Sequence, residues 1–368
     1  MTQYHRIIDD IVVQLNRKSL KEIMVNFFIN LLILLTISFL SVTAYADEPE
    51  KTFTYKDWLL VCDNGNTCQA VGYSNENRHE NSTMPAALVF QRKAGKHTEL
   101  TALLYLAFYD DTPLTKSPYH LWLNNKDLGT ITEDKPLGKN QVTALLVSLP
   151  NTAKITITDG TTTWTVSDKG FNAVFRKMDE IQGRLHTPGA VIVKGKQAES
   201  SVPDAPVVPT IHKHTVIDKN AKTIKAGDPL FEKYISLLNS VFSQHCDTPV
   251  GFFGEEVSFE LARLTDQQSL LLYHCWAAAY NFGDVAIVVN NTQPFQPQVV
   301  DSSITDYHNG ELGVSMKSRG IGDCWSRQSW VYDGKQFVLS EVYDTGLCRG
   351  IPGGVGPLNT YSTHIVTD

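Results

Sequence analysis

The chain has 368 residues, more than the roughly 250–300 at which one hydrophobic core usually divides, so more than one folded part is expected. Its hydrophobic content of 42% and its 16 prolines are those of an ordinary globular protein and exclude a disordered or fibrous one. The formal net charge of -7 argues against nucleic acid or an anionic membrane as the main ligand, because both require a basic face.

The first 46 residues have the parts of a cleavable secretory signal. A basic stretch precedes a short apolar run, residues 27–40, and a small-x-small triplet ends at Ala46, directly before Asp47. An uncleaved membrane anchor is the alternative, but the run is shorter than the roughly 18–20 apolar residues that span a bilayer. We therefore predict cleavage between Ala46 and Asp47, export of the chain, and a soluble mature product. The sequence leaves the translation start open between Met1 and Met24.

All six cysteines follow the predicted cleavage point. They are an even set in a chain bound for an oxidising compartment, which favours disulfides over metal or thiol chemistry. The chain has no C-x-x-C pair and no histidine at zinc-finger spacing from a cysteine pair, so we predict neither a metal nor a cofactor. The predicted disulfide residues are Cys62, Cys68, Cys246, Cys275, Cys324 and Cys348.

The first two cysteines lie at the ends of a predicted β-hairpin. Strand-like alternation over 53–62 leads to Cys62, and a second strand begins at Cys68. A two-residue turn would leave the cysteines out of register, whereas a three-residue loop with Asn66 left-handed places them directly opposite each other. Because cross-strand neighbours suit a disulfide, we predict this loop and a Cys62–Cys68 bridge.

Residues 47–193 are predicted to form an N-terminal β-rich domain. One of its strands is expected over 86–92, and apolar residues at i, i+3, i+4, i+7 and i+10 from Phe171 predict a one-sided helix packed on the sheet. Ser167 or Asp168 is placed to cap the start of this helix.

Residues 194–214 are predicted to form an extended linker, because they contain three prolines and little periodicity. His212 and His214 within it raise the alternative of a metal site. Two histidines in a flexible linker are more often solvated polar residues, so the linker interpretation is preferred.

Residues 215–368 are predicted to form a C-terminal α+β domain. Its first helix is capped by Asp228, with Pro229 in the first turn, and seven strands follow. The four cysteines of this part allow three pairings. Sequence order favours Cys246–Cys275 and Cys324–Cys348.

The last two predicted strands are joined through Asp333-Gly334, a two-residue hairpin signal. That register sets Trp330 opposite Phe337 as an aromatic cross-strand pair.

A search for reactive constellations finds no G-x-S-x-G, no H-E-x-x-H and no glycine loop that would hold a phosphate. Asp110-Asp111 and Asp179-Glu180 are carboxylate pairs adjacent in sequence. Neighbours in sequence usually point to different faces, so we interpret them as solvated surface residues and predict no catalytic residue.

Two segments are candidates for ligand contact. One, after Cys275, contains Trp276, Tyr280 and Asn281, an aromatic and amide cluster beside a predicted bridge. The other puts Arg349 before a glycine-rich loop, where backbone can approach a ligand and the guanidinium can bind a carboxylate or phosphate. The alternative is that these glycines only permit irregular backbone after the last strand.

Several of these motifs together resemble an uncharacterised family of exported Gram-negative proteins with six cysteines, one of those catalogued as a domain of unknown function. The motifs are Trp58-x-x-x-Cys62, Cys275-Trp276, Gly322-Asp323-Cys324, Trp330-x-x-Asp333-Gly334 and Cys348-Arg349-Gly350. The resemblance covers nearly all of the mature chain. It implies an exported protein with paired cysteines and a two-part architecture, and it brings no catalytic residue to carry over.

The N-terminal half is also similar to the invasion-associated locus B family. A W-x-x-x-C strand leads that domain and a Lys-Gly-Phe before a helix closes it. The matching residues are Trp58-x-x-x-Cys62 and Lys169-Gly170-Phe171, and the similarity covers about 130 residues.

The sequence thus predicts two mainly antiparallel-sheet α+β domains, each with a packing helix and stapled by disulfides. The favoured function is that of a periplasmic or secreted envelope protein without enzymatic activity, which binds another protein or an envelope component. The alternative is a secreted hydrolase acting on a cell-envelope component, with a site assembled from residues distant in sequence. A deep pocket that holds two or more converging ionisable groups near Arg349 or His274 would favour that alternative, whereas a shallow aromatic patch would favour binding.

Overall fold

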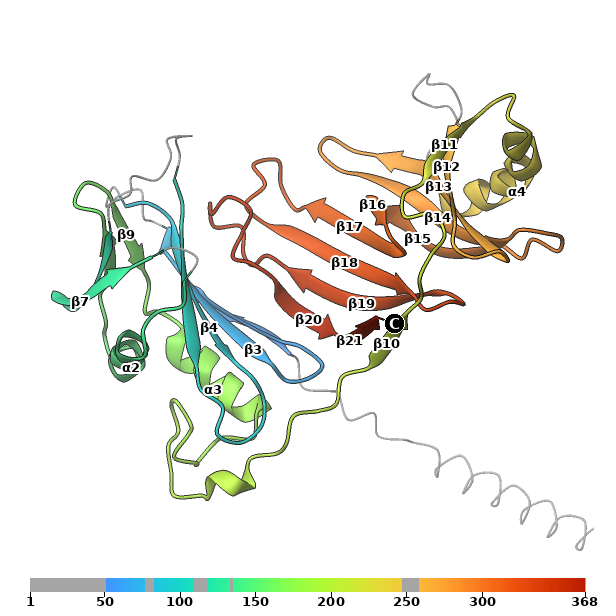
Figure 1. The fold of residues 1–368 in the computed structure, drawn as a ribbon. Coiled ribbons are helices and arrows are strands. Elements are labelled where there is room, and N and C mark those ends of the chain that lie inside the picture. The colour runs from blue at the N-terminus through green and yellow to red at the C-terminus, as the bar shows by residue number, and fades with distance from the viewer. Residues whose placement is uncertain (1–50, 77–82, 109–117, 133–134, 247–257, 368) are drawn as a thin grey trace, which may run out of the picture. The chain divides into compact units, whose positions relative to one another are not determined.

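The structure is a computed structural model that describes residues 51–76, 83–108, 118–132, 135–246 and 258–367, apart from the side chain of Phe242. In these ranges the chain forms mainly antiparallel sheets, with three α-helices beside them (Figure 1). This arrangement confirms the predicted α+β class. The predicted cleavage site at Ala46 and Asp47 lies outside the described residues. No helix within the described ranges has the length and apolar character needed to cross a membrane.

The first sheet has five strands in chain order. They are β1 (Thr52–Tyr55), β2 (Trp58–Cys62), β3 (Cys68–Tyr73), β4 (Ala86–Arg92) and β5 (Thr101–Leu106). The prediction of one continuous strand over 53–62 is wrong. Lys56 has a φ of 54° and the chain turns back there, so that Tyr55 pairs with Trp58.

The hairpin between β2 and β3 has the predicted register. Cys62 is paired with Cys68, and Asn66 is left-handed with a φ of 55°. The disulfide joins Cα atoms 4.0 Å apart. Asp63 stabilises the loop by accepting a hydrogen bond of 2.8 Å from the backbone N–H of Thr67.

A second sheet and two helices enclose the main core of this part of the chain. The elements are β6 (Tyr119–Leu123), β7 (Lys126–Ile131), β8 (Ile155–Thr158), β9 (Thr163–Val166), α2 (Lys139–Ser148) and α3 (Phe171–Ile181), with the strands in the order β7-β6-β8-β9. Trp58 is fully buried in this core, where its ring meets Phe171 and Phe175 edge-on at 5.1 and 5.8 Å. Its indole N–H donates to the Ser167 carbonyl at 2.8 Å.

Helix α3 begins differently from the prediction. Neither Ser167 nor Asp168 caps it; the N-cap is Gly170, with a φ of 115° and no side-chain bond. The Asp168 carboxylate instead accepts from the backbone N–H of Ala153 at 2.9 Å. A Cβ on Gly170 would lie 2.1 Å from the backbone oxygen of Tyr55, so the close approach of β1 requires glycine here.

The segment predicted as a linker contains a strand at its end. Residues Thr210–Lys213 form β10, which pairs in parallel with β21 (His364–Thr367). His212 is exposed opposite Val366, and the ring of His214 lies 6.1 Å from that of Tyr332. The domain boundaries on either side of this segment remain a prediction.

Two more sheets form the remainder. They contain β11 (Lys222–Lys225), β12 (Ser258–Arg263), β13 (Gln268–Ala277), β14 (Phe282–Asn290) and β15 (Gln298–Ile304), and then β16 (Asp306–His308), β17 (Glu311–Lys317), β18 (Trp325–Tyr332), β19 (Phe337–Asp344) and β20 (Leu358–Ser362). Alternate residues of β13 and β14 join two different clusters, one with helix α4 (Pro229–His245) and one with β16–β19. Asp228 accepts from the Leu230 N–H at 2.8 Å, as predicted for the cap of α4.

The hairpin between β18 and β19 corrects a predicted register. Tyr332, not Trp330, lies opposite Phe337, and Trp330 pairs with Leu339. The cause is Asp333, whose side chain accepts hydrogen bonds from the backbone N–H groups of Lys335 and Gln336, at 2.8 and 2.9 Å. These two local hydrogen bonds place the centre of the turn one residue further along the chain than the predicted two-residue turn at Asp333-Gly334.

The other two disulfides join the pairs that sequence order favours. Cys246–Cys275 ties the end of α4 to β13. Cys324–Cys348 joins the residue before β18 to the segment that follows β19. Both have Cα atoms 4.9 Å apart. Among the described residues no cysteine is free.

The outer face of the first sheet packs against the segment after β19. Val71 and Tyr73 share one buried cluster with Ile351 and Val355. The Tyr73 hydroxyl accepts from the Leu347 N–H at 3.0 Å, and burial raises the pKa of this phenol above its ordinary value, so it stays protonated.

Candidate functional site

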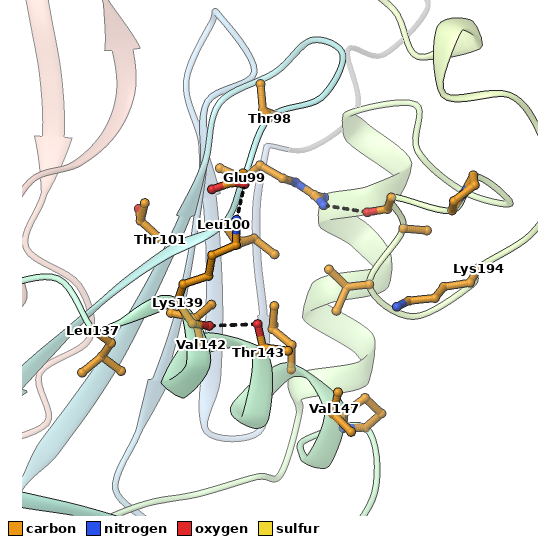
Figure 2. Close-up of a pocket in the computed structure, with 17 residues that line it drawn as sticks. Thr98, Glu99, Leu100, Thr101, Leu137, Lys139, Val142, Thr143, Val147 and Lys194 are labelled. Atoms are coloured by element: carbon orange, nitrogen blue, oxygen red, sulfur yellow. Dashed lines mark hydrogen bonds and ion pairs between the residues drawn. The ribbon is translucent and has the colours of Figure 1, made fainter. Parts of the chain in front are cut away.

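A pocket of about 630 Å³ opens between β5, helix α2 and the loop that follows α3 (Figure 2). We call this loop, residues 187–194, the pocket loop. The volume lies within the range of about 300–1,000 Å³ that is usual for small-molecule sites. None of the candidate residues predicted from the sequence lines this pocket, so sequence reasoning missed it.

The walls of the pocket are mostly apolar. Helix α2 contributes Val142, Leu146 and Val147, and the strand side contributes Leu100 and Leu137. Val147 is 69% exposed, although it is a large aliphatic side chain on a short helix whose other apolar residues are at least half-buried. Val147 therefore adds apolar surface at the edge of the pocket.

The floor of the pocket is Arg92, one partner of a buried ion pair. Arg92 closes strand β4 and is 2% exposed, and its guanidinium contacts the fully buried Asp179 of α3 at 2.6 Å. It also donates to the Gln182 side chain at 2.6 Å and to the Gly189 carbonyl at 3.4 Å. Burial lowers the pKa of Arg92 and the Asp179 charge opposes this, but an arginine stays charged in proteins.

The same carboxylate fixes the pocket loop. The second oxygen of Asp179 accepts hydrogen bonds from the backbone N–H groups of Val191 and Ile192, at 2.7 and 3.2 Å. The prediction that Asp179 lies on a solvated surface is therefore wrong; only its neighbour Glu180 is exposed. One buried carboxylate thus links the floor of the pocket to one of its walls.

A second ion pair lies beside Gly189 of the pocket loop. Arg184 is 1% exposed and contacts Glu199 at 2.5 Å, and it also donates to Thr98 at 2.6 Å. Burial alone would raise the pKa of Glu199, but the Arg184 hydrogen bond and charge outweigh it, so the pKa is lowered. Both ion pairs are neutral in sum, and the hydrogen bonds of the first pair to backbone groups hold the pocket loop in place.

The rim carries the remaining charges. Glu99 and Lys139 form an exposed pair at 2.8 Å on one side of the mouth, and this lysine lowers the pKa of the Glu99 carboxyl. Lys194, on the pocket loop, lies on the opposite side (Figure 2). With the pairs cancelled, the lining has one positive charge in excess.

Arg349, a predicted ligand contact, is in ion pairs with the first part of the chain. Its guanidinium lies 3.0 Å from Glu76 and 3.7 Å from Asp57, and its side chain is 14% exposed. Nearby, Asp323 accepts from the Gly350 N–H at 2.6 Å and from Arg319 Nε at 2.7 Å. These bonds order the backbone around the Cys324–Cys348 bridge.

The other predicted contacts, Trp276, Tyr280 and Asn281, lie at the turn between β13 and β14. The Asn281 side chain binds both backbone groups of Lys317 at 2.9 Å, which ties this turn to β17. The Trp276 indole donates to the Ser302 carbonyl at 3.0 Å, and Tyr280 is 46% exposed. The polar groups of Trp276 and Asn281 are thus hydrogen-bonded to the backbone of β15 and β17. They share no partner with Arg349, whose guanidinium pairs with Glu76 and Asp57.

An exposed pair of one histidine and one aspartate lies on the same two strands, β13 and β14. His274 Nδ1 is 3.1 Å from Asp284 across β13 and β14, and Glu260 is on the adjacent β12. Burial raises the pKa of Asp284, although the hydrogen bond and charge of His274 act in the opposite direction. Burial and the charge of Asp284 together raise the pKa of Glu260. Neither of the two described pockets that flank α2 is lined by these three residues, so the deep pocket that the hydrolase alternative requires is not shown here.

The sequence contains a signal for the buried ion pair beneath the pocket. Ala86, Leu88, Phe90 and Arg92 alternate along β4, so the arginine is in phase with residues that face the core. Asp179 follows Phe175 by four residues and continues the buried stripe of α3. A cation and a carboxylate in phase with two apolar faces that pack together predict a buried ion pair.

The fold and the pocket together define a disulfide-bonded, mainly antiparallel β protein with a preformed apolar cavity. A family model described as a protein of unknown function (DUF1176) matches residues 52–363, and the chain belongs to this family. This confirms the resemblance to an uncharacterised family catalogued as a domain of unknown function.

Among curated proteins, the chain is similar to the uncharacterized protein YpfG of Escherichia coli strain K12. The two are 24% identical over 319 residues, which is 77% of this chain and 85% of that protein. No solved structure matches the chain. The similarity of the N-terminal half to the invasion-associated locus B family is not shown by these comparisons.

Proposed function

We propose that the chain is an exported protein of the cell envelope that binds a small apolar ligand in the pocket beside α2. The observation that carries the proposal is the pocket itself. It combines apolar walls with a buried polar frame that holds its shape. Preorganised cavities of this composition suit binding, because little ordering has to accompany entry of the ligand.

Export is supported by two independent features. The sequence up to Ala46 has the parts of a secretory signal, and the structure has three disulfides, which persist in oxidising compartments such as the periplasm. We expect protein purified from the periplasm or the medium to begin at Asp47 when its N-terminus is sequenced. An intact leader on that protein would contradict export by this signal.

A blocked pocket tests the binding function. Thr143 lines the pocket from an exposed position on α2, so a tryptophan there can fill the cavity without entering the core. Wild-type protein is expected to bind the neutral probe N-phenyl-1-naphthylamine one to one, with a rise in probe fluorescence. Thr143→Trp should weaken binding at least about tenfold, which corresponds to roughly 1.4 kcal/mol.

The matched control is Asn140→Trp, on the same helix and also exposed but outside the lining. This variant adds the same apolar ring to the surface and should bind as the wild type does. The proposal fails if the wild type does not bind the probe, or if the two tryptophan variants have the same affinity.

A further inference from the structure

We infer that the pocket takes an amphipathic anion, a single alkyl chain with a carboxylate or phosphate head, and that Lys194 binds the head. The inference rests on the proposed function, because it assigns a chemical class to the ligand of the same pocket. Three features of the cavity support it: the composition of its walls, the state of its buried charges, and the position of one lysine.

The walls select the chain of the ligand. Val142, Leu146 and Val147 of α2 form one apolar side, and Leu100 lies on the strand side. The lining of these walls is aliphatic, without a tyrosine or tryptophan to stack on a planar ring. Aliphatic walls favour a flexible alkyl chain, because each buried methylene adds apolar surface removed from water.

The buried charges do not attract an ion. Arg92 donates to Asp179 and Gln182, and Arg184 contacts Glu199, so both guanidinium groups already have a carboxylate partner. Exchange of such a partner for a ligand would leave a buried carboxylate without its counter-charge, which is costly. The floor therefore gives the pocket shape, and the charge that selects a ligand lies at the rim.

At the rim one cation has no counter-charge. Glu99 and Lys139 neutralise each other, whereas Lys194 has no ion-pair partner among the residues that the structure describes. Figure 2 shows its side chain reaching toward the pocket from the loop side, with the Glu99–Lys139 pair on the other side. An anionic head bound by Lys194 would complete the charge balance of the lining while its chain lies along α2. A cationic head would meet an uncompensated like charge there.

Titration of the purified, disulfide-intact protein with four amphiphiles of equal chain length tests this assignment. The four are dodecanoate, dodecyl phosphate, dodecanol and dodecyltrimethylammonium, each below its micelle concentration, with affinity measured by displacement of N-phenyl-1-naphthylamine. The two anions should bind about tenfold more tightly than dodecanol, as expected for one charge-assisted contact at a partly exposed site. A preference between the two anions would distinguish a free fatty acid from a monoacyl phosphate as the source.

Two lysine variants locate the effect. Lys194→Met should remove the preference for anions and leave the affinity for dodecanol unchanged. Lys196→Met, two residues along the same exposed segment but outside the lining, should keep the preference. Equal affinities for dodecanoate and dodecanol, or equal losses in the two lysine variants, would overturn the inference. If Thr143→Trp nevertheless abolishes binding of every amphiphile, the pocket remains a binding site and only the assigned class of ligand is wrong.

Discussion

Replacement of Asp179 by alanine is expected to lower the free energy of unfolding by about 3–5 kcal/mol. Asp179 is fully buried, and its loss leaves the Arg92 guanidinium, itself 2% exposed, without a counter-charge. The backbone N–H groups of Val191 and Ile192 lose their acceptor at the same time. Urea denaturation followed by tryptophan fluorescence measures the change.

The neighbouring acidic residue is the matched control for this variant. Glu180 follows Asp179 in α3, is exposed and makes only a surface pair of 3.2 Å with Lys177. Glu180→Ala should change stability little, because exposed pairs in helices contribute little. Equal effects of the two alanine variants would show that Asp179 is not a buried ion-pair partner.

A double variant separates stability from the shape of the pocket. Arg92→Met combined with Asp179→Leu replaces the ion pair with apolar groups, an exchange that is often neutral or stabilising. It should recover most of the stability that Asp179→Ala loses. The pocket loop would still lack its acceptor for Val191 and Ile192, so binding of N-phenyl-1-naphthylamine should be weaker than in the wild type. This result would show that the buried carboxylate positions a wall of the pocket.

Local chemistry explains which parts of the fold were predictable from the sequence. The Cys62–Cys68 register follows from a loop of a few residues, and Asp228 acts within its own helix turn, so both were predicted. The Asp333 turn was also local, but its side-chain acceptor competes with the two-residue turn, and the partner of Trp330 moved by two residues, from Phe337 to Leu339. Where two local geometries are close in energy, the sequence does not decide between them.

The pocket depends on longer-range contacts. Arg92 and Asp179 are 87 residues apart, and each alone is a charged residue beside an apolar stripe. Only their phase in β4 and α3 indicates burial, and nothing in the sequence of the pocket loop places its backbone over them. The candidates chosen from composition, Arg349 and Asn281, are instead engaged with other parts of the chain. Residue type indicated what these groups can bind, and the tertiary contacts determined what they do bind.

The second large effect is expected at Gly170. Gly170→Ala should destabilise the protein by about 2–5 kcal/mol, because it combines an unfavourable left-handed backbone with overpacking against a neighbouring strand. The φ of this residue is 115°, and an added Cβ would lie 2.1 Å from the Tyr55 oxygen and 3.3 Å from the Trp58 Cβ. The backbone N–H of Asp57 donates to the Lys169 carbonyl at 3.1 Å, so the β1–β2 turn and the start of α3 cannot separate without loss of this bond.

A second left-handed glycine isolates the contribution of the close approach. Gly160 has a φ of 94° in the turn between β8 and β9, and an added Cβ there would have nothing within 4 Å. Gly160→Ala should therefore cost only the backbone term, about 1–2 kcal/mol, in the same urea experiment. The excess at Gly170 measures how tightly β1 and β2 pack on α3, the helix that carries Asp179. If the two glycine variants lose the same stability, β1 does not approach the helix as closely as the structure indicates, and the support of the pocket floor from that side is absent.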